Sequence, residues 1–471
     1  MFRFDNSYLQ LPEKFFSKEM AEKAPTPQEV FLNYDLFTEL NIHLDDTKEL
    51  IKILAGNKVH FGSVPHSQAY AGHQFGHFTM LGDGRAIHLG EHLSMNSERF
   101  DIQLKGAGPT KFSRRGDGRA TLKSMLREYL MSEAMHKLGI PSSRSLAVIK
   151  TGNDVYRETV HDGAILTRVM KSHIRIGTFE YIRHFGTFDE LKQFTDYTIN
   201  RLYPDVMNRS NPIEAFIQEF SSRQMKLVAQ WMSVGFIHGV MNTDNVAISA
   251  ETFDYGPCAF MNAYHPETVF SSIDSTGRYS FGNQPNIISW NIVRFIEVML
   301  PLLDPEKEKA IELANAIIET LQSHWNEAYA LCMIQKIGFD KKSQEKIDCL
   351  NELLSLMQKY QWDYTNTFAS LTHDFEFPAV SSDNPELKLW KESWKKLVPD
   401  TNLMRRINPV FIPRNHRVEE ALNEADKDNY VPFSKLLTIL SNPYQLEKDF
   451  IEFTKPPDEN FEQCYQTFCG T

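Results

Sequence analysis

The sequence has few cysteines, no excess of positive charge and no long uninterrupted apolar run. Five cysteines in 471 residues are too few for the disulfide framework of a small secreted protein. The formal net charge of −11 argues against a nucleic-acid-binding protein, because such proteins usually carry a basic excess. No window reaches the roughly 18 consecutive apolar residues of a membrane-spanning helix. We therefore expect no nucleic-acid partner and no membrane.

The length and composition are typical of a globular protein with more than one lobe. A chain of 471 residues is too long for one small core. Hydrophobic residues make up 42% and charged residues 24%, which are ordinary values for a globular protein. The first residues, MFRFDNSYLQLPEKFF, have neither the apolar core of a signal peptide nor the composition of a transit peptide. We expect a cytoplasmic location.

Short alternating segments dominate the chain up to about residue 170. In ERFDIQLKG (98–106) apolar and polar residues alternate, which is typical of a strand. Among these strands, residues 122–138 predict one helix, because apolar residues recur there every four positions. Gly139 and Pro141 end it, Gly as a cap and Pro as a barrier to continuation.

Helical periodicity dominates after about residue 175. Several long segments have apolar residues at a period near 3.6. The clearest of these segments are 189–203, 211–235, 289–303, 305–338 and 346–361. We therefore predict a two-lobed α+β fold, with a β-rich N-terminal lobe at 1–171 and a larger helical C-terminal lobe at 172–471. A nucleotide in the cleft between the lobes would fit this arrangement.

The segment IHGVMNTDNVAI (237–248) resembles the catalytic loop of a protein kinase without its acid. In a kinase this loop reads H-R-D-x-x-x-x-N, in which the Asp accepts the substrate hydroxyl proton and the Asn holds magnesium. His238 and Asn245 keep the kinase spacing, but Val240 occupies the position of the Asp. Valine cannot accept a proton, so either the chain is catalytically dead or another residue does the chemistry.

Other parts of a nucleotide site flank this loop. Asp254 begins a D-Y-G triplet that matches the kinase D-F-G, and with Asn245 it would supply hard oxygen ligands for Mg²⁺ or Mn²⁺. The intervening residues predict a hairpin that brings Asn245 and Asp254 together. Lys105 at the end of a strand and Glu128 on the predicted helix match the kinase ion pair. The alternative is that both are solvated, as such charges mostly are.

A Gly-Asp-Gly-Arg core occurs twice, in LGDGR (81–85) and RGDGR (115–119). One interpretation is two tight turns, because Asp-Gly is a strong hairpin signal. The other is a phosphate site, in which backbone N–H groups and Arg85 bind phosphate oxygens. Arg168 and Arg175 would add two more cations to such a site, unless they only make surface ion pairs.

His73 and His77 have the four-residue spacing of paired metal ligands on a helix. The adjoining Gly72 and Gly76 make a helix unfavourable there, and no H-E-x-x-H acid accompanies the pair. Packed or capping histidines fit this segment better than a metal site.

Together these segments resemble the selenoprotein O family, which contains kinase-fold protein adenylyltransferases formerly classed as pseudokinases. The resemblance lies between about residues 60 and 290, in AGHQFG, LGDGR, QLKGAGPT, SRRGDGRA, REYLMSEAM, LTRV…SHIRIGTFE, GFIHGVMNTDN and DYGPCAFM. It implies a protein-kinase-like fold that binds ATP flipped relative to a kinase. AMP would then be transferred to Ser, Thr or Tyr hydroxyls of protein substrates, redox proteins among them, and pyrophosphate would leave.

The resemblance also implies a role for individual residues. Asp244 would be the catalytic base, Asn245 and Asp254 would hold Mg²⁺ or Mn²⁺, and Lys105 would pair with Glu128. Three arginines and a lysine suit phosphates buried in a closed pocket, where charge must be paired. The positions that match nucleotide-binding positions of the family are Gly82, Gly84, Arg85, Lys105, Asp117, Gly118, Arg168 and Arg175, with Glu128 and Asp254 beside them.

The cysteines depart from the family pattern. Family members often carry a redox-active Cys or selenocysteine near the C-terminus, where this chain has Cys464 and Cys469. The segment after D-Y-G, HPETVFSSID, lacks the cysteine common there, and Cys258 is the only nearby substitute. The resemblance therefore gives little support to a regulatory disulfide in this chain.

Two other functions stay open at this point. An ordinary phosphotransferase would bind ATP in the kinase orientation, and Val240 argues against it. A nucleotide-binding pseudokinase scaffold would have no turnover, and the intact pair Asn245 and Asp254 argues against that.

Overall fold

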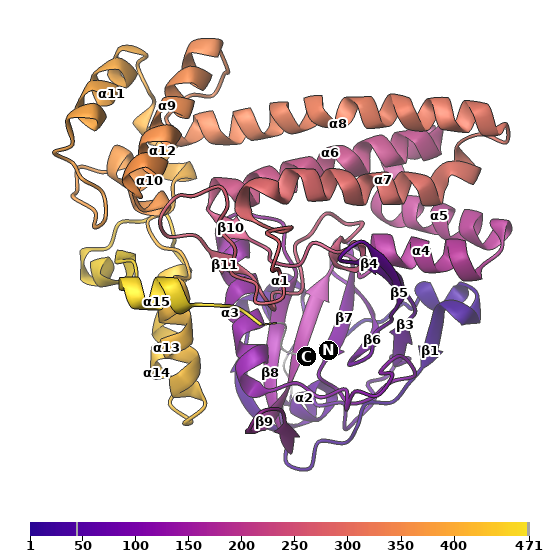
Figure 1. Cartoon of the computed structure of the whole chain (residues 1–471). Coiled ribbons are helices and arrows are strands. Elements are labelled where there is room, and N and C mark those ends of the chain that lie inside the picture. The colour runs from indigo at the N-terminus through magenta and orange to yellow at the C-terminus, as the bar shows by residue number, and fades with distance from the viewer. Residues whose placement is uncertain (44–45, 469–471) are drawn as a thin grey trace.

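A computed structural model describes residues 1–43 and 46–468, and it has two lobes (Figure 1). The first part of the chain forms a large antiparallel sheet, and long helices dominate the second part. A lysine on a central strand faces a glutamate on the helix that follows, as in protein kinases. The predicted α+β, protein-kinase-like class is confirmed.

Seven antiparallel strands form the main sheet, in the order β1-β3-β6-β7-β9-β8-β2. Strand β7 is central and pairs with β6 and β9, so its side chains are deep in the lobe. The two further sheets are the hairpin β4–β5 and the short pair β10–β11. The strands are β1 (Phe16–Lys18), β2 (Gln28–Leu32), β3 (His66–Gln68), β4 (Ala71–Gln74), β5 (His77–Met80), β6 (Ala86–Leu93), β7 (Arg99–Lys105), β8 (Arg144–Tyr156), β9 (Val160–Met170), β10 (Phe236–Ile237) and β11 (Ala259–Phe260).

Alternate residues of β7 point to opposite faces of the sheet, as the sequence predicts. Ile102 and Leu104 join the apolar cluster formed with α1 (Tyr34–Glu39) and α2 (Thr47–Leu54). Lys105 points to the other face, which α3 covers. The alternation thus separates the structural core of the lobe from its polar face.

Helix α3 (Leu122–Lys137) carries the acidic partner of this lysine. The side chain of Thr121 accepts the N–H of Ser124 and so begins the helix, and Gly139, at φ +74°, follows its end. The helix predicted at 122–138 is therefore confirmed. Most residues of α3 are buried, and Glu128 is one of them.

Twelve further α-helices follow the main sheet in the described part of the chain, and those predicted from periodicity are among them. The helices are α4 (Ile176–Phe185), α5 (Phe188–Leu202), α6 (Pro212–Ser233), α7 (Gln284–Leu303), α8 (Lys307–Lys336), α9 (Gln344–Tyr360), α10 (Tyr364–Thr372), α11 (Pro385–Lys396), α12 (Thr401–Ile407), α13 (Asn415–Ala425), α14 (Val431–Leu440) and α15 (Glu459–Cys464).

Residues 281–303, which include α7, are long and apolar enough to span a membrane by length and composition. Half of its apolar 18-residue window is buried inside the protein. Helix α7 packs against α4, α6 and α8, so its apolar surface belongs to the core of the helical lobe.

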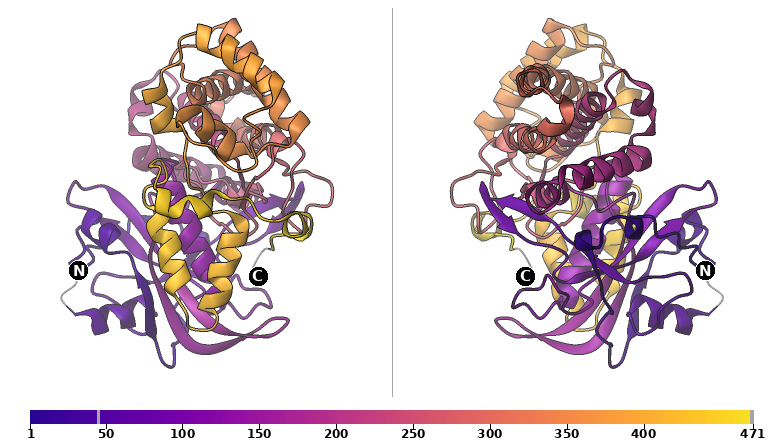
Figure 2. Two further views of the ribbon diagram at one scale, coloured as in Figure 1. Left: turned by 90° about the vertical axis from the view of Figure 1, so that its left-hand side faces the viewer. Right: turned by 90° about the vertical axis from the view of Figure 1, so that its right-hand side faces the viewer.

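The last helices return to the β-rich lobe. Figure 2 shows α13 and α14 beside α3, and Arg127 on α3 lies 3.1 Å from Glu419 on α13. Strand β9 ends at Met170 and α4 begins at Ile176. The predicted domain boundary between residues 171 and 172 lies in this connection. It stays a prediction, because α13 and α14 from the C-terminal part of the chain pack against α3 in the β-rich lobe.

Candidate active site

A cavity of about 880 Å³ lies between the lobes. It receives residues from the sheet, from α3 and from the loops that begin the helical lobe. Every site residue that the sequence singles out lines it: Gly82, Gly84, Arg85, Lys105, Asp117, Gly118, Glu128, Arg168, Arg175, Asp244, Asn245 and Asp254. The fold thus gathers segments that are far apart in the sequence around one space.

A buried group of charges joins both lobes at the floor of the cavity. Nζ of Lys105 lies 2.7 Å from Oε2 of Glu128 and also donates to Asp254. Nε of Arg168 donates to Oε1 of Glu128 at 2.8 Å. Burial alone would raise the pKa of Glu128, but Arg168 and Lys105 outweigh it and hold this pKa below its usual value. The solvated alternative is therefore wrong for Lys105 and Glu128.

Asp254 has the conformation and the charge of a potential metal ligand. Its φ of +64° is in the left-handed region, which is rare outside glycine, and its side chain is 34% exposed to the cavity. Although burial raises its pKa, Lys105, Arg168 and Arg85 lower it further, so the carboxyl stays ionised. An ionised, accessible carboxylate is a hard ligand for Mg²⁺ or Mn²⁺.

Asn245 fits the same role. Its Nδ2 donates to the carbonyl of Val240 at 3.1 Å, which leaves the amide oxygen for a ligand in the cavity. The hairpin predicted between Asn245 and Asp254 is wrong. The intervening residues pair with other segments instead, Ala247 with Arg175 and Thr252 with Ser142.

Asp244 lies next to Asn245 and is buried. Its backbone oxygen accepts a hydrogen bond from Arg175 at 3.1 Å, while its side-chain Oδ1 has no hydrogen-bond partner among residues 1–43 and 46–468. Burial raises the pKa of Asp244 to about 6, against the lowering effect of Arg175. A carboxylate with one free oxygen that titrates near neutrality is suited to accept a proton, although the Gln74 side chain also hydrogen-bonds this carboxyl and lowers its pKa.

Arg175 is held in place by a residue that the sequence reasoning missed. Its guanidinium stacks on the ring of Tyr70 at 4.0 Å, and its Nη2 lies 3.7 Å from Oδ1 of Asp83. Asp83 is buried and also accepts the N–H of Gln68 at 3.0 Å. The signal was present, because Asp83 is the acid of LGDGR. We interpreted it only as a turn residue.

The two Gly-Asp-Gly-Arg loops lie against each other. Thr110, which leads into the second loop, donates to the carbonyl of Asp83 at 2.7 Å. A Cβ at Gly82, which has φ +119°, would lie 2.4 Å from the ring of Phe112. Neither loop is a hairpin turn, because the first connects β5 to β6, which do not pair, and the second connects β7 to α3.

Asp117 is the exposed one among the predicted site residues, and it already has an ion-pair partner. Oδ2 lies 2.8 Å from Arg157 on the β8–β9 turn, and this bond lowers the pKa of Asp117. Arg157 was not predicted. Other cavity cations that the sequence reasoning did not select are Arg114, Arg115, Arg119 and Arg127.

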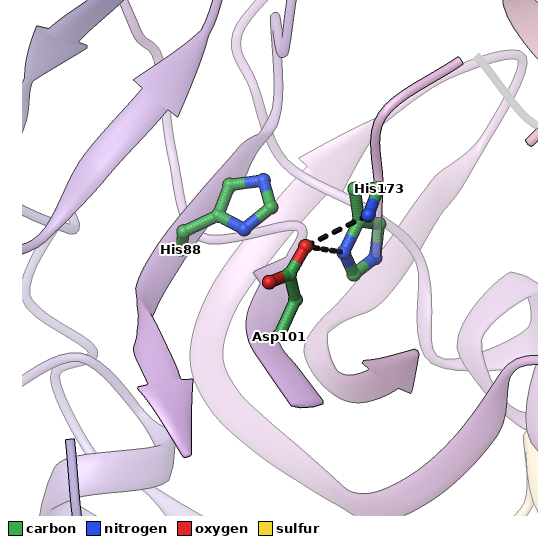
Figure 3. Close-up of side chains that lie close together, drawn as sticks. All are labelled: His88, Asp101 and His173. Carbon is green, nitrogen blue, oxygen red and sulfur yellow. Dashed lines mark hydrogen bonds and ion pairs between the residues drawn. The ribbon is translucent and has the colours of Figure 1, made fainter. Parts of the chain in front are cut away.

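A cluster of His88, Asp101 and His173 offers three potential metal-ligand atoms within 4.8 Å of one another (Figure 3). Asp101 already accepts the backbone N–H of His173 at 2.7 Å and pairs with Arg201 at 2.6 Å. These contacts compensate the buried carboxylate without an ion. His88 lies 3.1 Å from Asp83, so the cluster supports the residue beside Arg175.

The four described cysteines are free thiols: Cys258, Cys332, Cys349 and Cys464. Cys258 is buried, and burial raises its pKa to about 12, which makes it a poor thiolate. Cys464 is exposed, and Cys469 lies outside the described residues. The geometry gives no support to a disulfide at Cys258.

A family model and similar curated relatives both indicate a protein nucleotidyltransferase family. The family model described as protein adenylyltransferase SelO matches residues 1–441. A protein nucleotidyltransferase YdiU of Clostridium perfringens (strain SM101 / Type A) is 48% identical over 482 residues, which covers 100% of this chain and 98% of the relative. A protein of the same name from Clostridium botulinum (strain Hall / ATCC 3502 / NCTC 13319 / Type A) is 48% identical over 479 residues, with 99% and 97% covered.

Similarity to solved structures is much lower. Toxoplasma gondii ROP2, described as a virulence factor with a protein-kinase fold and no enzymatic activity, is 11% identical with a TM-score of 0.26. It covers 77% of this chain, and the match includes 95% of ROP2. A Toxoplasma gondii rhoptry antigen kinase domain is 10% identical, also with a TM-score of 0.26, covering 69% of this chain and 95% of that domain. The fold class rests on the elements described above.

Proposed function

This chain belongs to the protein adenylyltransferase SelO family, and from that membership we propose that it transfers AMP from ATP to Ser, Thr or Tyr hydroxyls of proteins and releases pyrophosphate. Membership makes the chain a nucleotidyltransferase with a kinase-like fold. Ser, Thr and Tyr hydroxyls are the acceptors that we propose in addition. A pseudokinase scaffold is correspondingly disfavoured.

The state of Asp244 is the observation that carries the proposal. The position of the kinase acid holds Val240, which is buried and cannot take a proton. Asp244 lines the cavity, has an unpartnered buried oxygen and has a pKa raised to about 6. It is therefore the base best prepared to accept a proton from an acceptor hydroxyl.

In the proposed reaction, Lys105, Arg168 and Arg175 bind the phosphates of ATP and pair their charge. Asn245 and Asp254 would hold Mg²⁺ or Mn²⁺, which when bound neutralises phosphate charge. Asp244 takes the proton of the acceptor hydroxyl while the oxygen of that hydroxyl bonds to the α-phosphorus. The bond from the α-phosphorus to the bridging oxygen breaks, and both electrons leave with pyrophosphate.

We further propose a cytoplasmic location and protein substrates that include redox proteins, without nucleic-acid or membrane partners. The two alternatives to AMP transfer are phosphoryl transfer and ATP binding without turnover. Phosphoryl transfer leaves a phosphate adduct and binding without turnover leaves none, so one experiment separates them from AMP transfer.

The test is mass spectrometry of an acceptor protein incubated with the purified chain, ATP and Mg²⁺ or Mn²⁺. We expect an AMP adduct on a Ser, Thr or Tyr side chain, and none with Asp244→Ala. A phosphate adduct would establish an ordinary kinase. ATP binding without any adduct across a proteome-wide set of acceptors would establish a scaffold.

A further inference from the structure

A second pocket of about 360 Å³ shares a wall with the nucleotide cavity. The wall is the hairpin of β4 and β5. Successive side chains of a strand point to opposite sides, so Gln74 lines the nucleotide cavity while His73 and Phe78 line the second pocket. The other lining residues come from α4 and α7: Glu180, Arg183, His184, Arg294, Glu297 and Val298.

The inner end of this pocket contacts the catalytic loop. The backbone N–H of His73 donates to Oγ1 of Thr243 at 2.7 Å, and Thr243 donates to Glu180 at 2.6 Å. The other oxygen of Glu180 lies 2.6 Å from Nδ1 of His73. Thr243 immediately precedes Asp244 in the sequence. Thr243 therefore links this pocket to the loop that carries Asp244, although Asp244 itself lines the nucleotide cavity on the other face of the hairpin.

Both acidic residues of the pocket are already paired. Glu180 binds His73 and Thr243, and Glu297 lies 2.5 Å from Arg294. The Arg183 side chain is exposed and forms no hydrogen bond or ion pair with any residue that the structure describes. The Arg183 guanidinium is thus available to an anion, although two glutamates line the same pocket and the whole chain has a net charge of −11.

Further positive charge surrounds the pocket. The ring of Trp290 contacts His73 at 5.6 Å between ring centres, and the guanidinium groups of Arg278 and Arg294 lie 4.9 and 5.4 Å from the Trp290 ring centre. Phe78 supplies an apolar wall, which His184 contacts at 5.1 Å. A short aliphatic chain that ends in a carboxylate matches this combination of apolar wall and cations.

We propose that this pocket binds an Asp or Glu side chain of the acceptor protein, near the hydroxyl that receives AMP. The proposal rests on the proposed function, because it requires the acceptor hydroxyl to reach Asp244 in the nucleotide cavity while the carboxylate lies on the opposite face of the β4–β5 hairpin. Acceptor proteins with an Asp or Glu near the modified hydroxyl should therefore be preferred substrates. Arg183 is the cation for the carboxylate, because Arg294 is already paired with Glu297.

Peptide binding tests this inference without any catalysis. Three unstructured peptides of equal length would each carry one Ser, one Thr and one Tyr, flanked by Glu, by Gln or by Lys. Fluorescence anisotropy would measure their affinity for the purified full chain in the absence of ATP. We expect the Glu peptide to bind most tightly and its affinity to fall as salt rises, because exposed charges are screened.

Substitution of Arg183 supplies the specific readout. Arg183→Gln should weaken binding of the Glu peptide by about fivefold, the scale of one exposed ion pair, and leave the Gln peptide unchanged. Arg183→Glu should reverse the preference in favour of the Lys peptide. Arg209→Gln is the matched control, because Arg209 is an exposed arginine of the same lobe outside both pockets.

Equal binding of the Glu and Gln peptides, or a preference that Arg183→Glu leaves intact, would overturn the inference. Transfer from α-labelled ATP to the same peptides separates this failure from that of the proposed function. Labelling without charge preference would leave AMP transfer standing and remove the acidic subsite. Charge-dependent binding without any labelling would support the subsite and count against AMP transfer to these hydroxyls.

Discussion

Gly72 and Asp244 are in direct contact, since a Cβ at position 72 would lie 2.6 Å from Oδ1 of Asp244. The absence of a side chain at Gly72 on strand β4 thus makes room for the carboxylate of Asp244, the proposed base. Any larger residue at 72 must displace the carboxylate or move the strand.

Gly72→Ala should therefore reduce turnover by about a hundredfold, because a displacement on the order of 1 Å misaligns a catalytic group. ATP affinity should stay close to that of the wild type, since Gly72 is not among the residues that line the nucleotide cavity. Steady-state kinetics and calorimetric ATP titration measure the two effects. Thr79→Ala, opposite Gly72 in the hairpin, is the control. Full activity of Gly72→Ala would show that Asp244 can relocate freely.

Replacement of Asp244 tests its role as the base. Asp244→Ala and Asp244→Asn should each reduce turnover by about a hundred- to ten-thousandfold, because neither accepts a proton. Nucleotide and metal affinity should change little. The Asn variant keeps the size of the side chain, so wild-type turnover with Asn would mean that Asp244 only fills space.

Lys105→Ala and Asp254→Ala should abolish transfer by different routes. Loss of Lys105 should weaken ATP binding, although Arg168 still compensates the buried Glu128. Loss of Asp254 should remove one metal ligand, and excess Mn²⁺ should restore part of the activity if Asn245 still binds it. ATP titrations at several metal concentrations distinguish these routes. If both variants kept full activity, the proposed nucleotide site would be wrong in both lobes.

Lys336, at the end of α8, should make stability depend on pH. It is buried with Nζ 4.2 Å from the ring centre of Phe368, and burial lowers its pKa from 10.5 to about 7. Between these values the unfolded chain binds more protons than the folded chain, so stability should rise from about pH 7 to pH 10.

Lys336→Met should remove this dependence and raise the free energy of unfolding at pH 7 by roughly 2 kcal/mol, because the cost of burying the charge disappears. Calorimetric Tm values at pH 7 and pH 9 measure both effects. Lys341→Met changes an exposed lysine and should leave the pH dependence intact. A lower Tm for Lys336→Met at pH 7 would show that the ammonium stabilises the fold.

Local periodicity was enough to predict the elements that carry the site. The alternation around Lys105 located it on a strand, and the repeat in α3 located Glu128 on the following helix. The strand alternation and the helical repeat each involve residues close together in the chain, so both can be recognised in a single sequence. The pairing of these two residues across the lobe followed from the kinase pattern.

The prediction was weaker where non-local contacts determine the structure. The backbone between Asn245 and Asp254 binds segments near Ser142 and Arg175, so its local hairpin signal was misleading. The burial of Asp83 depends on Gln68 and on the cluster that includes His88. No pattern within a short window contains such contacts.

The most direct measurement of the central claim compares α-labelled with γ-labelled ATP. The purified chain, a divalent metal and protein acceptors are incubated with each, and both protein label and released pyrophosphate are quantified. The account predicts that the α-label becomes attached to protein in proportion to the pyrophosphate released, that the γ-label does not, and that Asp244→Ala abolishes both signals. Transfer of the γ-label without the α-label would contradict it.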